Sequence, residues 1–141
     1  MHGKASSPAE MEALGCAAAE RIILGDVFGL IGGLGSGKTH WTRGFVAALG
    51  AEAQATSPTF PLIHEYSAKE LTVFHFDFYR LESAEELLAL GWDEYLEAGG
   101  VIVAEWADKF PDLMPPATIW LRFSINADGG RTVELLEEFS G

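Results

Sequence analysis

One stretch of eight residues, over positions 32–39, limits what this chain can fold into more than any other. It reads Gly-Gly-Leu-Gly-Ser-Gly-Lys-Thr and fits the pattern G-x-x-x-x-G-K-S/T. Its glycines allow a tight turn in which successive backbone N–H groups point inward at phosphate oxygens, and the helix that follows adds the positive end of its dipole. The pattern therefore predicts a phosphate-binding loop, and the alternative is a glycine-rich turn before an ordinary helix.

The residues on both sides of the loop supply the strand and the helix that such a loop requires. Residues 26–31 form an apolar run that predicts a buried strand, and residues 38–49 place apolar side chains at helical spacing before Gly50. In a loop of this kind, Lys38 reaches the β and γ phosphates, and the Thr39 hydroxyl binds the Mg²⁺ that neutralises the same oxygens. We therefore expect a strand–loop–helix unit that binds a nucleotide with Mg²⁺.

The acidic composition narrows the choice of partners. The 141 residues include 21 Asp and Glu against 9 Lys and Arg, a formal net charge of −12. Because nucleic-acid backbones are held by clustered Lys and Arg, we expect no direct DNA binding, and any contact with RNA should come through a partner. An anionic nucleotide must then bind against an unfavourable overall field, so Lys38, the loop and Mg²⁺ should supply the affinity.

Length and hydrophobicity predict a single domain over residues 1–141, since 48% of the residues are hydrophobic and can form one core. No apolar stretch approaches the roughly 20 residues needed to cross a bilayer, and the first residues lack the apolar region of a secretory signal. We therefore expect no membrane association and a cytoplasmic location. The single cysteine, Cys16, lies in an apolar helical pattern and is expected to be buried.

The rest of the chain alternates between helical and strand patterns, which predicts a P-loop nucleoside triphosphatase fold of the α/β class. Serine caps indicate helices over residues 8–24 and 84–90, and a short turn is expected over 92–96. Apolar runs predict strands over 62–66, 71–77 and 101–105, and a final hairpin joins 118–125 to 132–139. The expected sheet is mostly parallel at its centre, with antiparallel edge strands and flanking helices.

Two of these strands end on an acid, Asp77 in one case and Glu105 in the other. Parallel strands bring their carboxyl ends to one edge of a sheet, where the loop after the first strand also lies, so both acids should point at the phosphate site. A nucleoside triphosphatase needs such a carboxylate to hold Mg²⁺ or to orient the attacking water. We assign Glu105 to the metal and the catalytic water, and Asp77 to the same cluster, with a structural role as its alternative.

Three other residues lie close to this site in the expected fold. Thr59 occupies the first connection after the loop helix, where nucleotide switches place a hydroxyl that senses the γ phosphate, although a proline-rigidified turn is the alternative. His75 shares a strand face with Asp77 and could approach the site, but a lone histidine in a strand is more often packed. Trp106, beside Glu105, could cover the nucleotide or a partner surface, or pack in the core.

Several short motifs match, in order, more than a phosphate loop requires. They are Gly32-x-Leu34-Gly35-x-Gly37-Lys38-Thr39 with Thr42-Arg43-Gly44, Ser57-Pro58-Thr59-Phe60, His75-Phe76-Asp77-x-Tyr79-Arg80-Leu81, Glu85-Glu86-Leu87 to Gly91, and Glu105-Trp106 with Leu113-x-Pro115. Together they resemble the bacterial TsaE (YjeE) family over about residues 25–131. Three residues depart from the usual pattern: Gly33 replaces an aspartate, Ser36 an alanine and His40 a hydroxyl residue. None of these changes removes a phosphate-binding group, but the extra glycine bears on the affinity for ATP.

The resemblance implies an ATPase required for threonylcarbamoyl modification of adenosine 37 in tRNAs that read codons starting with A. It implies an accessory protein that binds the TsaD and TsaB pair, resets that complex by ATP hydrolysis, and meets tRNA only through it. Carried over by motif, Thr39 and Glu105 would hold Mg²⁺, Asp77 would assist catalysis, and Thr59 would belong to a mobile switch. The residues that would contact ATP or ADP are Leu34, Gly35, Ser36, Gly37, Lys38, Thr39 and Trp106.

Two other classes of protein use the same loop. A small phosphotransferase would close a lid with several basic residues over the transferred phosphoryl group, and this chain has no arginine-rich segment long enough to form one. A nucleotide-responsive binding module with negligible turnover is the second alternative, because the placement of an attacking water is a matter of geometry.

Overall fold

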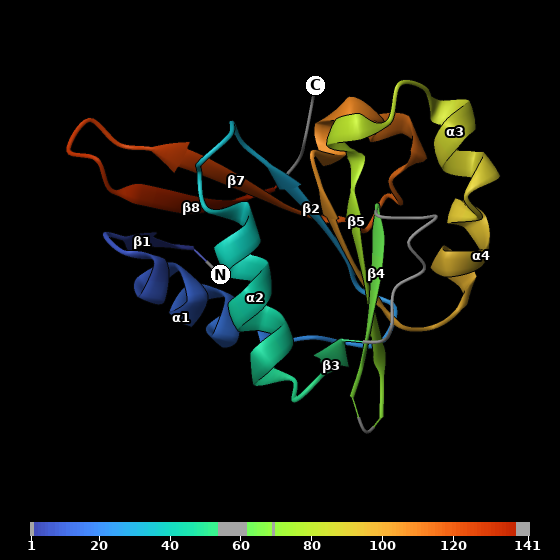
Figure 1. The fold of residues 1–141 in the computed structure, drawn as a ribbon, viewed down its shortest axis with the longest axis horizontal. Helices are drawn as coiled ribbons and strands as arrows, with labels where there is room; N and C mark the ends of the chain where they lie inside the picture. Colours follow the sequence, from blue (N-terminus) through green and yellow to red (C-terminus); the bar gives the residue numbers. More distant parts are fainter. Residues whose placement is uncertain (1, 54–61, 69, 138–141) are drawn as a thin grey trace.

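The computed structural model describes residues 2–53, 62–68 and 70–137, and one sheet forms its centre (Figure 1). The strands are β1 (Gly3–Ala5), β2 (Val27–Ile31), β3 (Glu52–Ala53), β4 (Ile63–Ser67), β5 (Thr72–Asp77), β6 (Val101–Glu105), β7 (Ile119–Ile125) and β8 (Arg131–Leu136). They form an eight-stranded sheet in the order β1-β8-β7-β2-β6-β5-β4-β3.

The central strands β7, β2, β6 and β5 run parallel to one another, and every antiparallel pair lies nearer an edge. The α/β class expected from the sequence is therefore confirmed. Antiparallel strands flank the parallel centre on both sides, in agreement with the antiparallel edge strands that the sequence predicted. The short strands β1 and β3 had no counterpart in the sequence prediction, because two or three residues show no periodicity.

The parallel register fixes the position of the two acids. All five residues of β2 and all five of β6 are buried, as their continuous apolar runs indicated. Leu30 of β2 pairs with Glu105 of β6, and Asp77 of β5 pairs with the same Glu105. The acids of β5 and β6 therefore lie side by side at the end of the sheet where β2 enters its loop.

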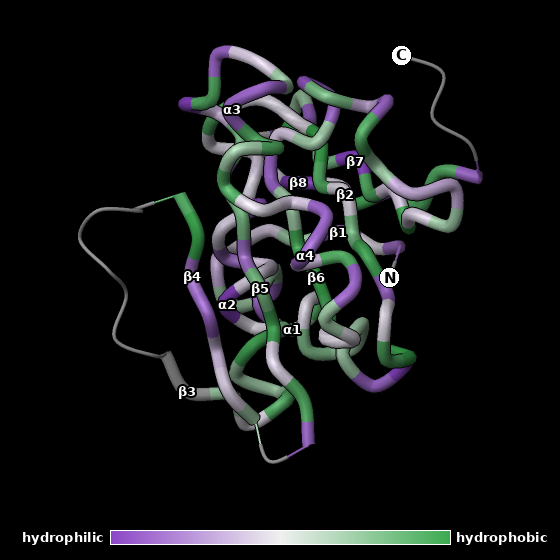
Figure 2. The backbone as a smooth tube through the Cα atoms, turned by 90° about the vertical axis from the view of Figure 1, so that its right-hand side faces the viewer, coloured by the Kyte–Doolittle hydropathy of each residue, from purple (hydrophilic) through white to green (hydrophobic). Residues whose placement is uncertain are grey.

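Helices cover both faces of the sheet (Figure 1). The four α-helices are α1 (Pro8–Ala19), α2 (Lys38–Ala48), α3 (Ala84–Ala89) and α4 (Trp92–Glu97), and three short 3₁₀ helices are η1 (Phe78–Arg80), η2 (Ala107–Lys109) and η3 (Pro111–Leu113). Trp41 and Phe45 of α2 pack against Phe28 on one face, while Trp92 of α4 packs against Phe76 on the other. Figure 2 shows hydrophobic residues along the middle strands and hydrophilic ones at the outer turns.

Helices α1 and α2 touch backbone to backbone. A Cβ atom added at Gly15 would lie 1.9 Å from the carbonyl oxygen of Trp41, and one at Gly44 would lie 1.9 Å from that of Glu12. No side chain larger than hydrogen fits at either position unless the helices separate. The two glycines therefore hold α1 directly on the helix that follows the glycine-rich loop.

Three local predictions were wrong. Helix α1 ends at Ala19 rather than near residue 24, because the Asp26 carboxylate accepts a hydrogen bond from the backbone N–H of Ile23 (2.9 Å) and forms a turn there. Residues 92–97 form α4 rather than a turn, because Gly91 adopts the left-handed conformation (φ 97°) and starts a new helix at once. Cys16 is exposed rather than buried.

In residues 2–53, 62–68 and 70–137, no helix combines the length and the apolar character needed to cross a membrane.

Candidate functional site

The loop between β2 and α2 has the backbone shape that its glycines predict. Gly32, Gly35 and Gly37 have positive φ angles of 151°, 77° and 105°, and a Cβ at Gly32 would lie 2.5 Å from the carbonyl oxygen of Phe123. Helix α2 begins at Lys38, and none of the described side chains caps it. The N–H groups of its first turn are therefore available to an anion at the helix N-terminus.

Lys38 lies buried at the base of this loop, with 5% of its surface exposed. Its ammonium donates hydrogen bonds to the carbonyl oxygens of Gly32 and Gly33, the second at 3.0 Å, and lies 4.1 Å from the ring centre of Trp106. Burial lowers the pKa of Lys38 from its usual value, while the negative charges of Glu105, Asp108 and Asp77 oppose the shift. A buried ammonium whose contacts are mostly neutral favours an anionic ligand.

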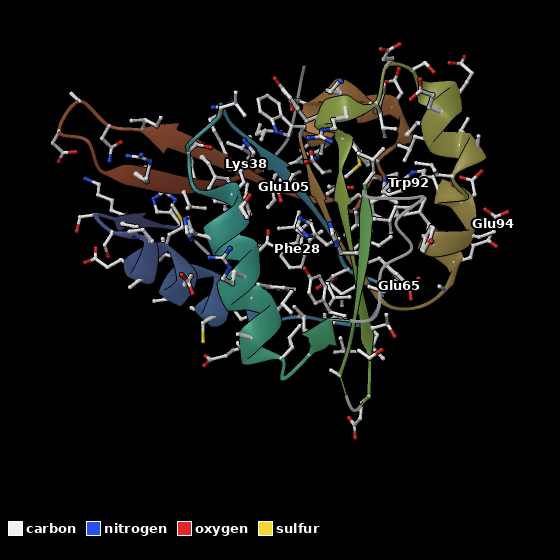
Figure 3. The ribbon with its side chains drawn as sticks, in the orientation of Figure 1. Phe28, Lys38, Glu65, Trp92, Glu94 and Glu105 are labelled. Atoms are coloured by element: carbon white, nitrogen blue, oxygen red, sulfur yellow. The ribbon has the colours of Figure 1, made fainter. Side chains whose placement is uncertain are left out.

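Glu105, at the end of β6, joins the loop to the neighbouring strand. The Thr39 hydroxyl donates a hydrogen bond to Oε1 of Glu105 at 3.3 Å, and Nε2 of His75 lies 2.6 Å from Oε2. Glu105 is 7% exposed, and Figure 3 shows its side chain and that of Lys38 at the same end of the sheet. The structure thus brings together the hydroxyl and the carboxylate that the sequence assigned to Mg²⁺.

Asp77 lies at the end of β5, beside Glu105, and makes a structural contact. Its Oδ1 accepts a hydrogen bond from the backbone N–H of Tyr79 at 3.0 Å and so caps η1. Oδ1 of Asp77 is used in that cap, whereas Oδ2 makes no hydrogen bond to Tyr79. The two roles weighed for Asp77 from the sequence are therefore compatible.

Trp106 has an unusual backbone conformation. With φ at 60°, it is the one non-glycine residue with positive φ in the described part of the chain. Bulky residues adopt this conformation at a cost, and such strain persists where the surrounding structure imposes it. The conformation places the indole over the Lys38 ammonium and 4.9 Å from the Tyr79 ring. Trp106 therefore lies over the base of the loop and also packs against the core, and its contact with a nucleotide stays a prediction.

These residues line one pocket of about 510 Å³, within the range of small-ligand sites. We call its deep part the loop end, formed by Lys38, Thr39, Asp77, Glu105 and Trp106. The rim is formed by residues 5–8, Met11, Gly129 and Arg131, and the pocket is also lined by Leu34, Gly35, Ser36, Gly37, His40 and Tyr79. In Figure 1, β1 and the β7–β8 hairpin lie on one side of the loop, and the ends of β5 and β6 lie on the other.

Sequence reasoning missed the rim. The Arg131 side chain donates from Nε to the carbonyl oxygen of Gly35 at 2.9 Å and from Nη1 to that of Gly129, so it ties the hairpin to the loop. No local pattern marks a contact between residues so far apart in sequence. His75 was named but left as more often packed, and the signal that could have selected it is its strand face, which it shares with Asp77.

Two of the residues predicted from the sequence, Leu34 and Thr59, are not among the buried residues that the structure describes at this site. Leu34, at the tip of the loop, is 69% exposed although it lines the pocket. Thr59 lies outside the described residues, so its assignment as a switch residue stays a prediction.

The donor set suits Mg²⁺ that is shared with a ligand. In the described residues, no group of three or more His, Cys, Asp and Glu side chains could hold a metal ion on its own. Mg²⁺ is usually bound by one or two protein oxygens together with phosphates and waters. Thr39 and Glu105 fit that arrangement.

Comparison with known proteins gives consistent matches. The family model described as Threonylcarbamoyl adenosine biosynthesis protein TsaE matches residues 5–133. Two proteins named tRNA threonylcarbamoyladenosine biosynthesis protein TsaE are similar over most of the chain. The one from Bacillus subtilis is 35% identical over 144 residues, which cover 95% of this chain and 90% of the relative. The one from Treponema pallidum is 37% identical over 109 residues, covering 77% and 80%.

A solved structure shows the same fold. The crystal structure of Bacillus subtilis YdiB matches with a TM-score of 0.78 at 30% sequence identity, and the match covers 96% of this chain and 83% of YdiB.

Proposed function

This chain belongs to the TsaE family, and from that premise we propose that it is a Mg²⁺-dependent ATPase that serves tRNA modification. The modification is threonylcarbamoylation of adenosine 37 in tRNAs that read codons starting with A. The relatives carry the name of this biosynthesis. The ATPase activity is proposed from the site itself.

The observation that carries the ATPase proposal is the convergence at the loop end. A buried ammonium (Lys38), a helix-terminal hydroxyl (Thr39) and a strand-terminal carboxylate (Glu105) meet in one pocket, although they come from α2 and β6. Hydrolysis of a triphosphate depends mainly on positioning and on stabilising negative charge, and these groups supply both.

Each residue has a distinct proposed role. Lys38 would exchange its contacts with the carbonyls of Gly32 and Gly33 for β and γ phosphate oxygens, which are stronger acceptors. Thr39 and Glu105 would hold Mg²⁺, which when bound neutralises charge on the phosphates. Glu105, assisted by Asp77, would orient the attacking water. Trp106 would cover the phosphates, and Thr59 would sense the γ phosphate.

The rim would then take the nucleoside, because the phosphates occupy the loop end. The proposal also holds that residues 1–141 form one ATPase domain and that the protein is cytoplasmic. The net charge of −12 favours a partner with a basic surface. We propose that this partner is the TsaD and TsaB pair, and that tRNA is reached only through it.

The test is steady-state phosphate release from Mg·ATP by the protein alone and with its TsaD and TsaB partners, without tRNA. We expect slow release by the protein alone and strong stimulation by the pair. The Lys38→Ala variant serves as the control for contaminating ATPases. The proposal fails if the pair has no effect and phosphate appears instead on a small acceptor, which would indicate a kinase.

A further inference from the structure

We infer that His75 is a positioning residue for Glu105: its imidazole holds Oε2 of the carboxylate so that Oε1 faces Thr39 and the metal site. This inference rests on the proposed function and adds a residue to its machinery. His75 lies on β5, and Glu105 lies on the neighbouring strand β6. Pairing of these two strands brings the two side chains together without the help of a loop.

The geometry of the contact is tight and shielded. Nε2 of His75 and Oε2 of Glu105 are 2.6 Å apart, and the two side chains are 11% and 9% exposed. His75 pairs in register with Val103, and Asp77 pairs with Glu105, so the imidazole reaches Glu105 diagonally across the two strands. The carboxylate is therefore held at both oxygens, by Thr39 on one and by His75 on the other.

The rest of the imidazole argues against a purely structural role. Nδ1 of His75 is buried and has no hydrogen-bond partner among the described residues. A buried polar atom without a partner costs free energy, and the neighbours Val73, Phe74 and Phe76 show that apolar side chains suit this strand. His75 thus occupies an apolar strand at a cost, and its one polar contact in the described chain is with Glu105.

Two rings of β4 lie beside the imidazole. The ring centre of His64 lies 5.9 Å from that of His75, and the ring centre of Tyr66 lies 6.4 Å from it. An ionised carboxylate can only accept hydrogen bonds, so Nε2 of His75 is the donor in this contact.

Fixing Glu105 matters because its side chain has three rotatable bonds. Hydrogen-bond partners of metal-ligating groups typically account for 10- to 100-fold in metal affinity or activity, because they orient the ligand. If His75 is lost, we expect Oε1 to sample several positions. Turnover at saturating ATP should then fall, together with the contribution of Mg²⁺ to ATP affinity.

Two amide substitutions separate positioning from folding. A glutamine at this position carries its amide nitrogen near the place of Nε2, whereas an asparagine carries it near the place of Nδ1, out of reach of Glu105. We expect His75→Asn to lower kcat by about 10- to 100-fold with a smaller change in KM, and His75→Gln to restore kcat to within about 5-fold of wild type. His64→Gln is the matched control, since His64 lies on β4 beside His75 and has ring contacts with Tyr66 and His75.

A readout independent of turnover is the ratio of ATP affinities measured with Mg²⁺ and with EDTA. This ratio should collapse in His75→Asn and be retained in His75→Gln and His64→Gln. In the ligand-free protein, ¹⁵N NMR should show the proton of His75 on Nε2, and Glu105→Ala should shift that resonance.

The outcomes are distinct. The inference is overturned if His75→Asn keeps wild-type kcat and the wild-type affinity ratio. It is also overturned if the asparagine and glutamine variants are equally impaired and equally lowered in melting temperature, which would indicate a packing role. If the wild-type protein does not hydrolyse ATP, the proposed function fails, and the affinity ratio and the NMR signal still decide the role of His75.

Discussion

The loop end and the rim of the pocket are built in different ways. The loop end lies where the parallel strands β2, β5 and β6 end, each with a neighbour on both sides, and two of its charged groups, Lys38 and Glu105, are 5% and 7% exposed. The rim combines an edge strand, the start of α1 and a hairpin turn, and Ser6, Ser7 and Gly129 are exposed. Side chains that must be placed accurately are therefore supported by the most constrained backbone in the molecule.

This difference separates two kinds of effect. Changes at the loop end should alter the chemical step or abolish binding, because the groups there are desolvated and their contacts are strong. Changes at the rim should alter affinity modestly, because the contacts there are exchanged with water. The four predictions below test this contrast, beginning with the largest effect.

Lys38→Ala should weaken ATP binding by roughly 1000-fold and remove detectable hydrolysis, because it deletes the buried cation that faces the phosphates. Isothermal titration with ATP measures the loss. Without nucleotide, the melting temperature should stay close to that of wild type, because burial disfavours the charge on Lys38. Affinity retained to within about 10-fold would show that the backbone N–H groups suffice.

Glu105→Gln should lower turnover by about 100-fold and weaken ATP binding in the presence of Mg²⁺, while ATP binding without the metal stays nearly unchanged. Glutamine keeps the size of the side chain and an oxygen that accepts from Thr39, but it removes the charge that orients water. Phosphate release and equilibrium binding, measured on the same preparation, separate the two effects. Unchanged turnover would remove Glu105 from the catalytic group.

Asp77→Asn should lower turnover by about 10-fold without loss of stability. The asparagine oxygen can still accept from the Tyr79 N–H, so the cap of η1 survives while the negative charge is lost. Asp77→Ala, the companion variant, should also lose about 1 kcal/mol in the free energy of unfolding. If the asparagine variant is fully active, Asp77 serves only as a cap.

Arg131→Ala should raise KM for ATP by about 3- to 5-fold and leave kcat within about 2-fold of wild type, as expected for the loss of a hydrogen bond worth about 1 kcal/mol. Its guanidinium holds the carbonyl of Gly35 and the turn at Gly129. Arg122→Ala is the control, because Arg122 lies on β7 and pairs at the surface with Glu134. If kcat falls by as much as in Asp77→Asn, the rim affects turnover as strongly as the loop end does, and the proposed difference between them is wrong.

The sequence predicted the central fold because that part depends on local patterns. The continuous apolar runs of β2 and β6 identified buried strands, and the serines at positions 7 and 83 identified helix starts that the structure confirms. The end of α1 was missed, because the apolar spacing continues past Ala19 into Ile22. The turn at Asp26 overrides that pattern.

The loop end was anticipated for a related reason. Asp77 and Glu105 are the last residues of parallel strands, so topology alone places them beside the loop. The contact between His75 and Glu105 was not anticipated, because it depends on the register between two strands. The contact between Arg131 and Gly35 depends on the sheet order across residues far apart in sequence, which no local pattern encodes.

Strand β1 has a consequence for the protein's fluctuations. It has three residues, Gly3–Ala5, and pairs only with β8, through residues 131–133. Short edge elements open locally at a small fraction of the free energy of global unfolding, whereas buried central strands open only when the whole domain does. Amide hydrogen exchange at Lys4 and at Val103 would measure this difference. We therefore expect β1 to open locally while the carboxylates on β5 and β6 remain in register, so that movement at this edge need not disturb the groups proposed to act on phosphate.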